Sequence, residues 1–234
     1  MVYREVATAS MVPVAQGPSS HPPSTLSHVQ DQGQVEVTRT VEYYDRFADA
    51  YAARFAAVDL AEDRKRFQSS LPARGRVLDA GCAAGRDCAL FAREGFLPFG
   101  IDLSAKFVMA TREHVTPRVA RADVQRLPFQ TGAFDGVWCC AVLVHLPPAG
   151  ARRALNEIGR VTRRGGPLFV TTRFGTGSEW RSGPEDGVRW FQLYSLSEIE
   201  EIVCDAGFDI QSARCEAGAV SGQWVSVHAT RRSS

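Results

Sequence analysis

The sequence lacks the features that most directly assign a chain to a membrane or to nucleic acid. It has no uninterrupted apolar run near the ~20 residues of a membrane helix, and no secretory signal is evident in its first residues. Its net charge is only +1. This balance gives no general electrostatic reason to bind nucleic acid or an anionic membrane, although it leaves a local basic patch open.

The six cysteines also lack a metal-binding pattern. No C-x-x-C pair is present, and Cys139 and Cys140 are adjacent, so the spacing does not indicate zinc and no metal is expected. Most of the cysteines lie in apolar runs, which predicts small, reduced core residues. Reduced cysteines in turn favour a cytoplasmic location.

The chain of 234 residues suits one domain of moderate size with a tail. Residues 1–37 are rich in Ser, Pro, Gln, Gly and Thr and offer little apolar surface to offset the entropy of ordering. We therefore expect a flexible tail over 1–37 and a single domain over 38–234. At its start, Val41, Tyr44 and Tyr51 recur at helical spacing, which predicts an N-terminal helical cap.

Strand and helix patterns alternate over the rest of the chain, and two strands end it. Alternation of this kind predicts an α/β, doubly wound fold, with a mostly parallel sheet and helices on both faces. Ligands of such sheets bind in the crevice at the carboxyl ends of the strands. Polar or small residues stand at or just past four of these ends, namely Asp79, Asp102, Asp123 and Cys140.

A run of small residues, "LDAGCAAG", follows the first predicted strand. Gly81 and Gly85 bracket the turn into a helix, and glycine lets a ligand approach the backbone closely. Such a turn can hold a dinucleotide pyrophosphate or S-adenosylmethionine (SAM), or serve only as a tight turn. It fits the dinucleotide pattern G-x-G-x-x-G poorly, and the charge of Asp79 suits a cationic amino-acid end better than a pyrophosphate.

Asp102 closes the second predicted strand in "FGIDLS", about 20 residues beyond the glycine turn. A carboxylate at this position can accept hydrogen bonds from both ribose hydroxyls. Dehydrogenases use the position too, so Asp102 supports a nucleoside ligand more than a particular reaction. A contribution to the start of the next helix is the structural alternative.

These segments together resemble the class I SAM-dependent methyltransferases of the small-molecule type. Asp79, Gly81 and Gly85 match the acidic residue and glycines of the family's first motif, whereas Ala83 replaces its central glycine. "RADVQRLPF", "FDGVWCCAVLVHLPP" and "RRGGPLFV" are similar to later family segments in order and spacing, so the resemblance spans roughly residues 41–229. It implies a Rossmann-like, seven-stranded, mostly parallel sheet whose last strand is antiparallel.

The resemblance implies SAM as the methyl donor and S-adenosylhomocysteine as the product. It assigns the ribose to Asp102, the adenine to Asp123 and Val124, and the methionine side to Cys140 and Ala141. The residues expected to bind the cofactor are Tyr44, Tyr51, Asp79, Ala80, Gly81, Cys82, Gly85, Arg86, Asp102, Leu103, Asp123, Val124, Cys140 and Ala141.

We expect the methyl acceptor to bind at an insertion over about residues 173–194, the stretch least like the family. Exposed aromatics beside arginines on a mobile loop suit a planar or anionic ligand. His145 is the candidate general base for a hydroxyl acceptor, with a loop-shaping histidine as the alternative. An amine acceptor needs no base. The residues expected to bind the acceptor are His145, Arg173, Trp180, Arg189, Trp190 and Tyr194.

The favoured interpretation is a methyltransferase (EC 2.1.1.-) that acts on an O or N atom of a small molecule in specialised metabolism, as a monomer or homodimer. One alternative is a tRNA or protein methyltransferase, favoured by arginines around the helix after the fourth strand: Arg152, Arg153, Arg160, Arg163 and Arg164. Another is a non-catalytic protein that binds SAM or a nucleoside. A nicotinamide dehydrogenase is disfavoured by Asp79 and the missing third glycine.

Overall fold

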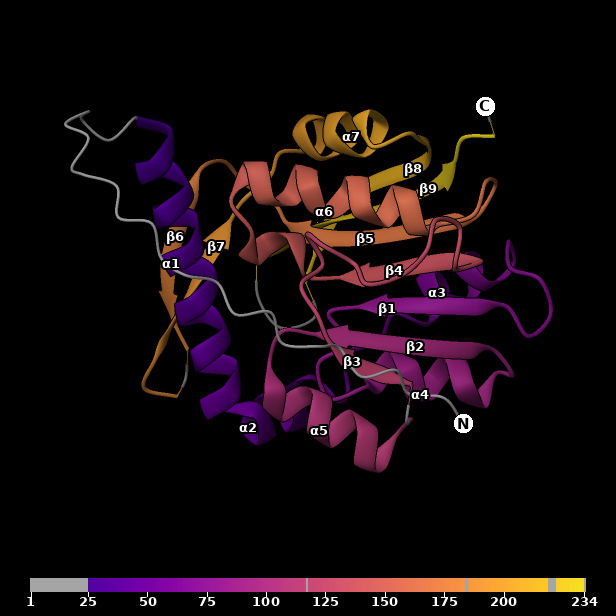
Figure 1. Cartoon of the computed structure of the whole chain (residues 1–234), viewed down its shortest axis with the longest axis horizontal. Helices are drawn as coiled ribbons and strands as arrows, with labels where there is room; N and C mark the ends of the chain where they lie inside the picture. Colours follow the sequence, from indigo (N-terminus) through magenta and orange to yellow (C-terminus); the bar gives the residue numbers. More distant parts are fainter. Residues whose placement is uncertain (1–24, 117, 184, 219–221, 234) are drawn as a thin grey trace, which may run out of the picture.

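A computed structural model describes residues 25–116, 118–183, 185–218 and 222–233. Its centre is a seven-stranded sheet of order β3-β2-β1-β4-β5-β9-β8 (Figure 1). Strands β1 to β5 are parallel, and β9 is antiparallel to both neighbours, which confirms the predicted fold. The strands are β1 (Arg76–Ala80), β2 (Leu97–Asp102), β3 (Val119–Arg121), β4 (Gly136–Cys140), β5 (Pro167–Arg173), β8 (Phe208–Ala217) and β9 (Gln223–Arg231).

Helices cover both faces of the sheet because side chains alternate along each strand. On β4, Val137 and Cys139 join the core that holds the buried side of α6 and α7. Trp138 points the other way and packs with Phe67 of α3 and Phe91 of α4. These helices are α3 (Ala61–Gln68), α4 (Arg86–Arg93), α5 (Ala105–His114), the short 3-10 helix η1 (Leu143–His145), α6 (Pro148–Val161) and α7 (Leu196–Asp205).

Local signals explain where the later helices begin and end. The hydroxyl of Ser104 accepts the N–H of Phe107 and caps α5. Ser195 and Glu198 form a reciprocal capping box at the start of α7. Gly207 follows that helix at φ +85°, in the left-handed region that glycine adopts without strain.

The N-terminal boundary differs from the prediction. Helix α1 (Thr25–Arg46) begins well ahead of residue 38, so the expected flexible tail is helical over 25–37, while residues 1–24 lie outside the described part. Val37 is buried in the core, and a Cβ on Gly33 would lie only 3.0 Å from Pro147. Tertiary packing therefore orders a segment too polar to show apolar periodicity. A break at Phe47 separates α1 from α2 (Ala48–Phe55).

The expected acceptor-side loop is instead a hairpin of β6 (Ser178–Ser182) and β7 (Val188–Gln192). Strand β7 packs against α1, and both lie beyond the carboxyl ends of the parallel strands (Figure 1). Trp190 and Tyr194 are each only 4% exposed, which corrects the expectation of exposed aromatics. Trp180 remains 39% exposed. The hairpin and α1 together enclose the crevice that the sequence pattern predicts.

No helix among the described residues has the length and apolarity needed to cross a membrane. All six cysteines are free thiols. Cys82, Cys88 and Cys139 are buried as expected, whereas Cys215 is exposed.

Candidate active site

The small-residue turn between β1 and α4 bends through left-handed backbone. Gly81, Ala83 and Gly85 have φ values of +78°, +46° and +80°. A Cβ on Gly81 would lie 2.2 Å from a methyl of Val142, so only glycine fits there. Ala83 adopts a conformation that costs a residue with a Cβ about 1–2 kcal/mol, and it is fixed by Thr111, whose hydroxyl donates to its carbonyl at 2.8 Å.

Asp102, at the end of β2, is held by two backbone donors. Its Oδ2 accepts the N–H of Ala83 at 3.0 Å, and its Oδ1 accepts the N–H of Ser104 at 2.8 Å. Burial raises the pKa of Asp102 to about 6, against the lowering effect of these hydrogen bonds. The carboxyl group is therefore mostly ionised at neutral pH. Since a carboxylate has about four lone-pair sites, two stay available for the hydroxyls of a ligand.

A cavity of about 110 Å³ opens beside this carboxylate. Leu103, Phe107 and Val124 contribute apolar walls to it. A carboxylate with spare acceptor sites beside apolar walls fits a ribose joined to a base. The residues present are therefore compatible with the nucleoside half of SAM, and the roles expected for Asp102, Leu103 and Val124 stay predictions.

A second cavity, of about 720 Å³, adjoins the first. The residues that line both are Tyr44, Tyr51, Gly81, Ala83, Cys140, Ala141 and His145. The larger cavity continues over the carboxyl ends of β5 and β8 and the amino end of β9 to Arg173, Arg214 and Trp224. A ligand that starts beside Asp102 and extends past the shared residues would reach into the larger cavity with its other end.

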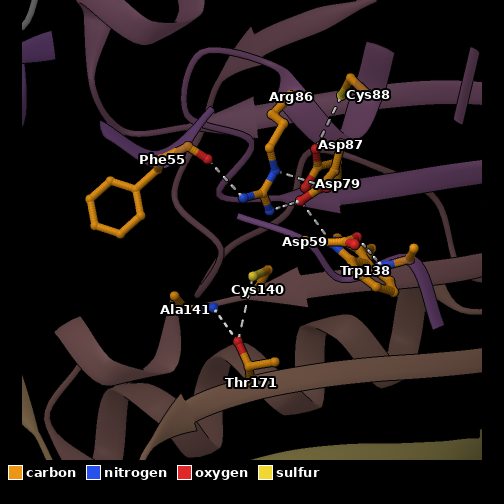
Figure 2. Close-up of polar contacts among 11 residues, drawn as sticks. Phe55, Asp59, Asp79, Arg86, Asp87, Cys88, Trp138, Cys140, Ala141 and Thr171 are labelled. Carbon is orange, nitrogen blue, oxygen red and sulfur yellow. Dashed lines mark hydrogen bonds and ion pairs between the residues drawn. The ribbon is translucent and has the colours of Figure 1, made fainter. Parts of the chain in front are cut away.

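The shared wall at β4 holds a thiol that is a poor nucleophile. The N–H of Ala141 donates to both the carbonyl and the hydroxyl of Thr171, at 3.1 and 3.0 Å, and that hydroxyl donates to the Cys140 sulfur at 3.5 Å (Figure 2). Burial raises the pKa of Cys140 to about 12. The thiol therefore stays protonated and does not compete with an acceptor.

His145 is held between two partners. Its Nδ1 lies 2.7 Å from the carbonyl of Trp190, which can only accept, so Nδ1 carries the proton. Its Nε2 then accepts the hydroxyl of Tyr44 at 2.7 Å, and Arg189 donates to the same hydroxyl at 3.3 Å. Burial lowers the pKa of His145 to about 4. The imidazole is thus neutral, and its basic nitrogen is occupied by the hydroxyl of Tyr44.

Arg86 lines the larger cavity but is already engaged. It donates to both oxygens of Asp87, at 3.1 and 2.7 Å, and to the carbonyl of Phe55 at 3.2 Å (Figure 2). Asp87 also accepts the indole N–H of Trp138 at 3.1 Å. Arg86 therefore links the end of α2 to the start of α4. Three of its N–H donors are already used in these contacts.

Asp79 is only 2% exposed and lines neither cavity, contrary to the expectation that it faces a ligand. Cys88 donates its S–H to Asp79 at 3.3 Å (Figure 2). Burial, together with the charge of Asp87, raises the pKa of Asp79. This carboxyl group therefore joins the end of β1 to α4 beneath the cavities.

Other expected residues also lie off the cavities: Ala80, Gly85, Asp123, Trp180, Trp190 and Tyr194. Asp123 directs its oxygens to Gln125, accepting its backbone N–H at 2.9 Å. Trp190 faces away because neighbouring residues of β7 point to opposite sides, so Arg189 and Phe191 face the larger cavity instead. Cys82, which was also expected, does line that cavity.

The residues predicted to bind the acceptor do not include Arg181, Phe191, Arg214 and Trp224, which line the larger cavity. Arg181 and Phe191 do lie within the segment 173–194 that was expected to bind the acceptor. The alternation within "VRWFQ" is a signal that could have indicated Phe191 once the segment was recognised as a strand. Arg214 carries no local signal, because only the pairing of β8 with β9 brings it to the crevice.

Comparisons with known proteins agree with this geometry. A family profile described as a methyltransferase domain matches residues 77–166. The chain is 30% identical over 186 residues to a tRNA (carboxymethyluridine(34)-5-O)-methyltransferase of Arabidopsis thaliana, covering 77% of this chain and 42% of that protein. It is 35% identical over 106 residues to a ubiquinone biosynthesis O-methyltransferase of Xanthomonas oryzae pv. oryzae, covering 43% and 44%. The chain thus spans less than half the length of either relative.

Among solved structures, the fold matches a Burkholderia thailandensis 1,6-didemethyltoxoflavin-N1-methyltransferase with a TM-score of 0.62 and 18% identity. The match covers 92% of this chain and 93% of that one, which was solved with 1,6-didemethyltoxoflavin and S-adenosylhomocysteine bound. The profile assigns residues 77–166 to a methyltransferase domain, the curated relatives are methyltransferases, and the solved structure shares the fold; together these findings support a class I SAM-dependent methyltransferase.

Proposed function

We propose that the chain transfers the methyl group of SAM to an O or N atom of a small molecule. The observation that carries this proposal is the cavity of about 720 Å³, which adjoins the Asp102 cavity through shared walls. Its volume lies within the range of roughly 300–1,000 Å³ that small-molecule sites occupy. Helices α1 and α2 and the β6–β7 hairpin contribute to its walls. Walls on several sides favour a compact acceptor molecule over the extended surface of a macromolecule.

In this proposal SAM supplies an electrophilic methyl group on a sulfonium. Asp102 holds the ribose, Leu103 and Val124 flank the base, and Gly81, Cys140 and Ala141 lie along the methionine side. The leaving thioether needs no proton, so the task of the protein is to align the acceptor with the methyl group and exclude water. Tyr44 and Tyr51 from α1 and α2 are placed to cover this junction, since both line the two cavities.

The state of His145 bears on the acceptor. An amine acceptor with a neutral lone pair reacts without a base. A hydroxyl acceptor must lose a proton, and the neutral Nε2 of His145 can take it once the Tyr44 hydroxyl is displaced or relays it. His145 is thus proposed as the base for a hydroxyl acceptor, with Tyr44 as the group that positions it.

The arginines that would favour RNA as the acceptor are engaged within the protein. Arg152 pairs with Glu201 and Asp205. Arg160 pairs with Glu157, and Arg163 pairs with Asp135. The remaining two donate to Gln125 (Arg153) and to the carbonyl of Ser233 (Arg164). The ion pairs of Arg152, Arg160 and Arg163 reduce the positive charge that this region offers to phosphates, which supports a small-molecule acceptor.

The test is to incubate the protein with methyl-labelled SAM and an extract of the source cells, and then separate small molecules, RNA and protein. The proposal expects label in the small-molecule fraction. Label in RNA or protein contradicts it in favour of a macromolecular acceptor. Label in no fraction, with SAM still bound, favours a non-catalytic binding protein.

A further inference from the structure

The register of the β6–β7 hairpin places two arginines at directly opposite positions on the two strands. Arg181 lies directly opposite Arg189 in the antiparallel pair, and Glu179 lies opposite Phe191. Because side chains alternate along a strand, these four residues share one face of the hairpin. Like charges directly opposite each other on a sheet are destabilising. Both arginines line the larger cavity, so the unfavourable pair faces a ligand space.

A third arginine joins them from the main sheet. The guanidinium carbons of Arg173, Arg181 and Arg189 lie 5.9, 5.6 and 5.2 Å from the centre of the Phe191 ring. Phe191 itself is only 5% exposed. The three guanidinium groups therefore gather around one buried ring at the cavity wall. We call Arg173, Arg181 and Arg189 the arginine cluster.

Internal partners do not balance the charge of the arginine cluster. Arg181 pairs with Glu179, whereas neither Arg173 nor Arg189 forms an ion pair with a carboxylate among the described residues. The Nε of Arg189 is buried without a hydrogen-bond partner. Burial and the charges of the other two arginines lower the pKa of Arg173, and Glu179 alone opposes them. Two partly buried cations thus lack the anion that such groups ordinarily have.

The other arginines at the cavity show that this is not a general property of the site. Arg54 pairs with Glu185, and Arg86 pairs with Asp87. Arg214 pairs with Asp63 and Glu216. Among the described arginines that line the cavity, Arg173 and Arg189 alone form no ion pair with a carboxylate. The position of the arginine cluster next to the Tyr44 hydroxyl, which Arg189 contacts at 3.3 Å, places it at the acceptor side of the shared wall.

We propose that the arginine cluster is the subsite for an anionic group, so that the methyl acceptor is a small molecule carrying a carboxylate or a phosphate. This inference rests on the proposed function of the same cavity. Guanidinium groups bind planar or branched oxyanions through paired N–H donors, and a partly buried site strengthens those bonds. The anionic group of the acceptor provides the negative charge that Arg173 and Arg189 lack within the protein. Binding of this group orients the rest of the acceptor toward the shared wall.

The test compares benzoate, phenyl phosphate and the neutral benzamide in NMR titrations of the protein, with and without S-adenosylhomocysteine. Hydrogen bonds to a charged group predict at least about tenfold tighter binding of one of the two anions than of benzamide. Arg173→Gln is expected to bring that anion to within about threefold of benzamide, whereas Arg173→Lys retains part of the preference. Arg153→Gln, which removes the same charge from the exposed face of α6, is the matched control and is expected to leave the preference unchanged.

Equal binding of benzamide and both anions by the unaltered protein overturns the inference. So does an Arg173→Gln variant that keeps the anion preference, or one that loses affinity for S-adenosylhomocysteine instead, because the cluster would then serve the methyl donor. The proposed function fails separately, if S-adenosylhomocysteine does not bind the unaltered protein. Melting temperatures of all variants confirm that a lost preference does not reflect unfolding.

Discussion

Replacing Asp102 by alanine tests the placement of the ribose. The carboxylate already accepts the N–H groups of Ala83 and Ser104 and keeps two lone-pair sites beside the smaller cavity. Hydrogen bonds to an ionised group contribute about 1.5–3 kcal/mol. Asp102→Ala should therefore weaken S-adenosylhomocysteine binding by roughly 10- to 150-fold, as measured by isothermal titration calorimetry.

Asp123→Ala is the matched control. It removes a carboxylate after the next strand, one that contacts Gln125 and lies off both cavities. We expect its effect on affinity to stay within about twofold, well below the contribution of one hydrogen bond. Asp102→Asn is the second variant, because it keeps the side-chain size if alanine disturbs the two backbone contacts. Unchanged affinity in both Asp102 variants, or an equal loss in Asp123→Ala, would refute this placement.

Three further predictions concern the pH, the turn and the base. Because the pKa of Asp102 is raised to about 6, the carboxylate is ionised above that pH, and below it protonation removes its charge and part of its acceptor capacity. Affinity for S-adenosylhomocysteine should thus be constant from pH 8 to 7 and fall below pH 6; constant affinity down to pH 5 would be inconsistent. Gly81→Ala should lose more stability in urea unfolding than Gly95→Ala, since both have a positive φ but only Gly81 has a neighbour, Val142, at 2.2 Å from the added Cβ; equal losses would argue against this close approach. His145→Ala should abolish methyl transfer to a hydroxyl acceptor and spare cofactor binding, and retained turnover would leave His145 with a structural role.

The sheet and the position of Asp102 followed from the sequence because their signals are local. Apolar runs mark the strands, and a carboxylate at a strand end needs no other segment to place it. Asp79 and Asp123 carry the same signal yet lie off the cavities. Their carboxyl groups interact with Cys88 and Gln125, contacts that only tertiary packing shows. Position along a strand therefore predicts the edge of the sheet, but not the direction of a side chain.

The acceptor side was harder to predict because its architecture depends on pairing between distant segments. The residues of β6 and β7 were interpreted as a mobile loop, and Trp190 was assigned to the ligand. Pairing into a hairpin turns Trp190 into the core and Phe191 toward the cavity. The prediction started the N-terminal helix too late for a related reason. Val37 packs against core residues that are distant in sequence, so no local pattern marks it. In both regions, long-range packing overrides weak local patterns.

The proposed function requires that the two adjoining cavities hold SAM. Calorimetric titration of the purified protein with SAM, followed by competition with S-adenosylhomocysteine, measures this in one experiment. We predict one site per chain for which the two ligands compete. Absence of binding by both ligands at neutral pH would contradict the assignment of the site and the function proposed from it.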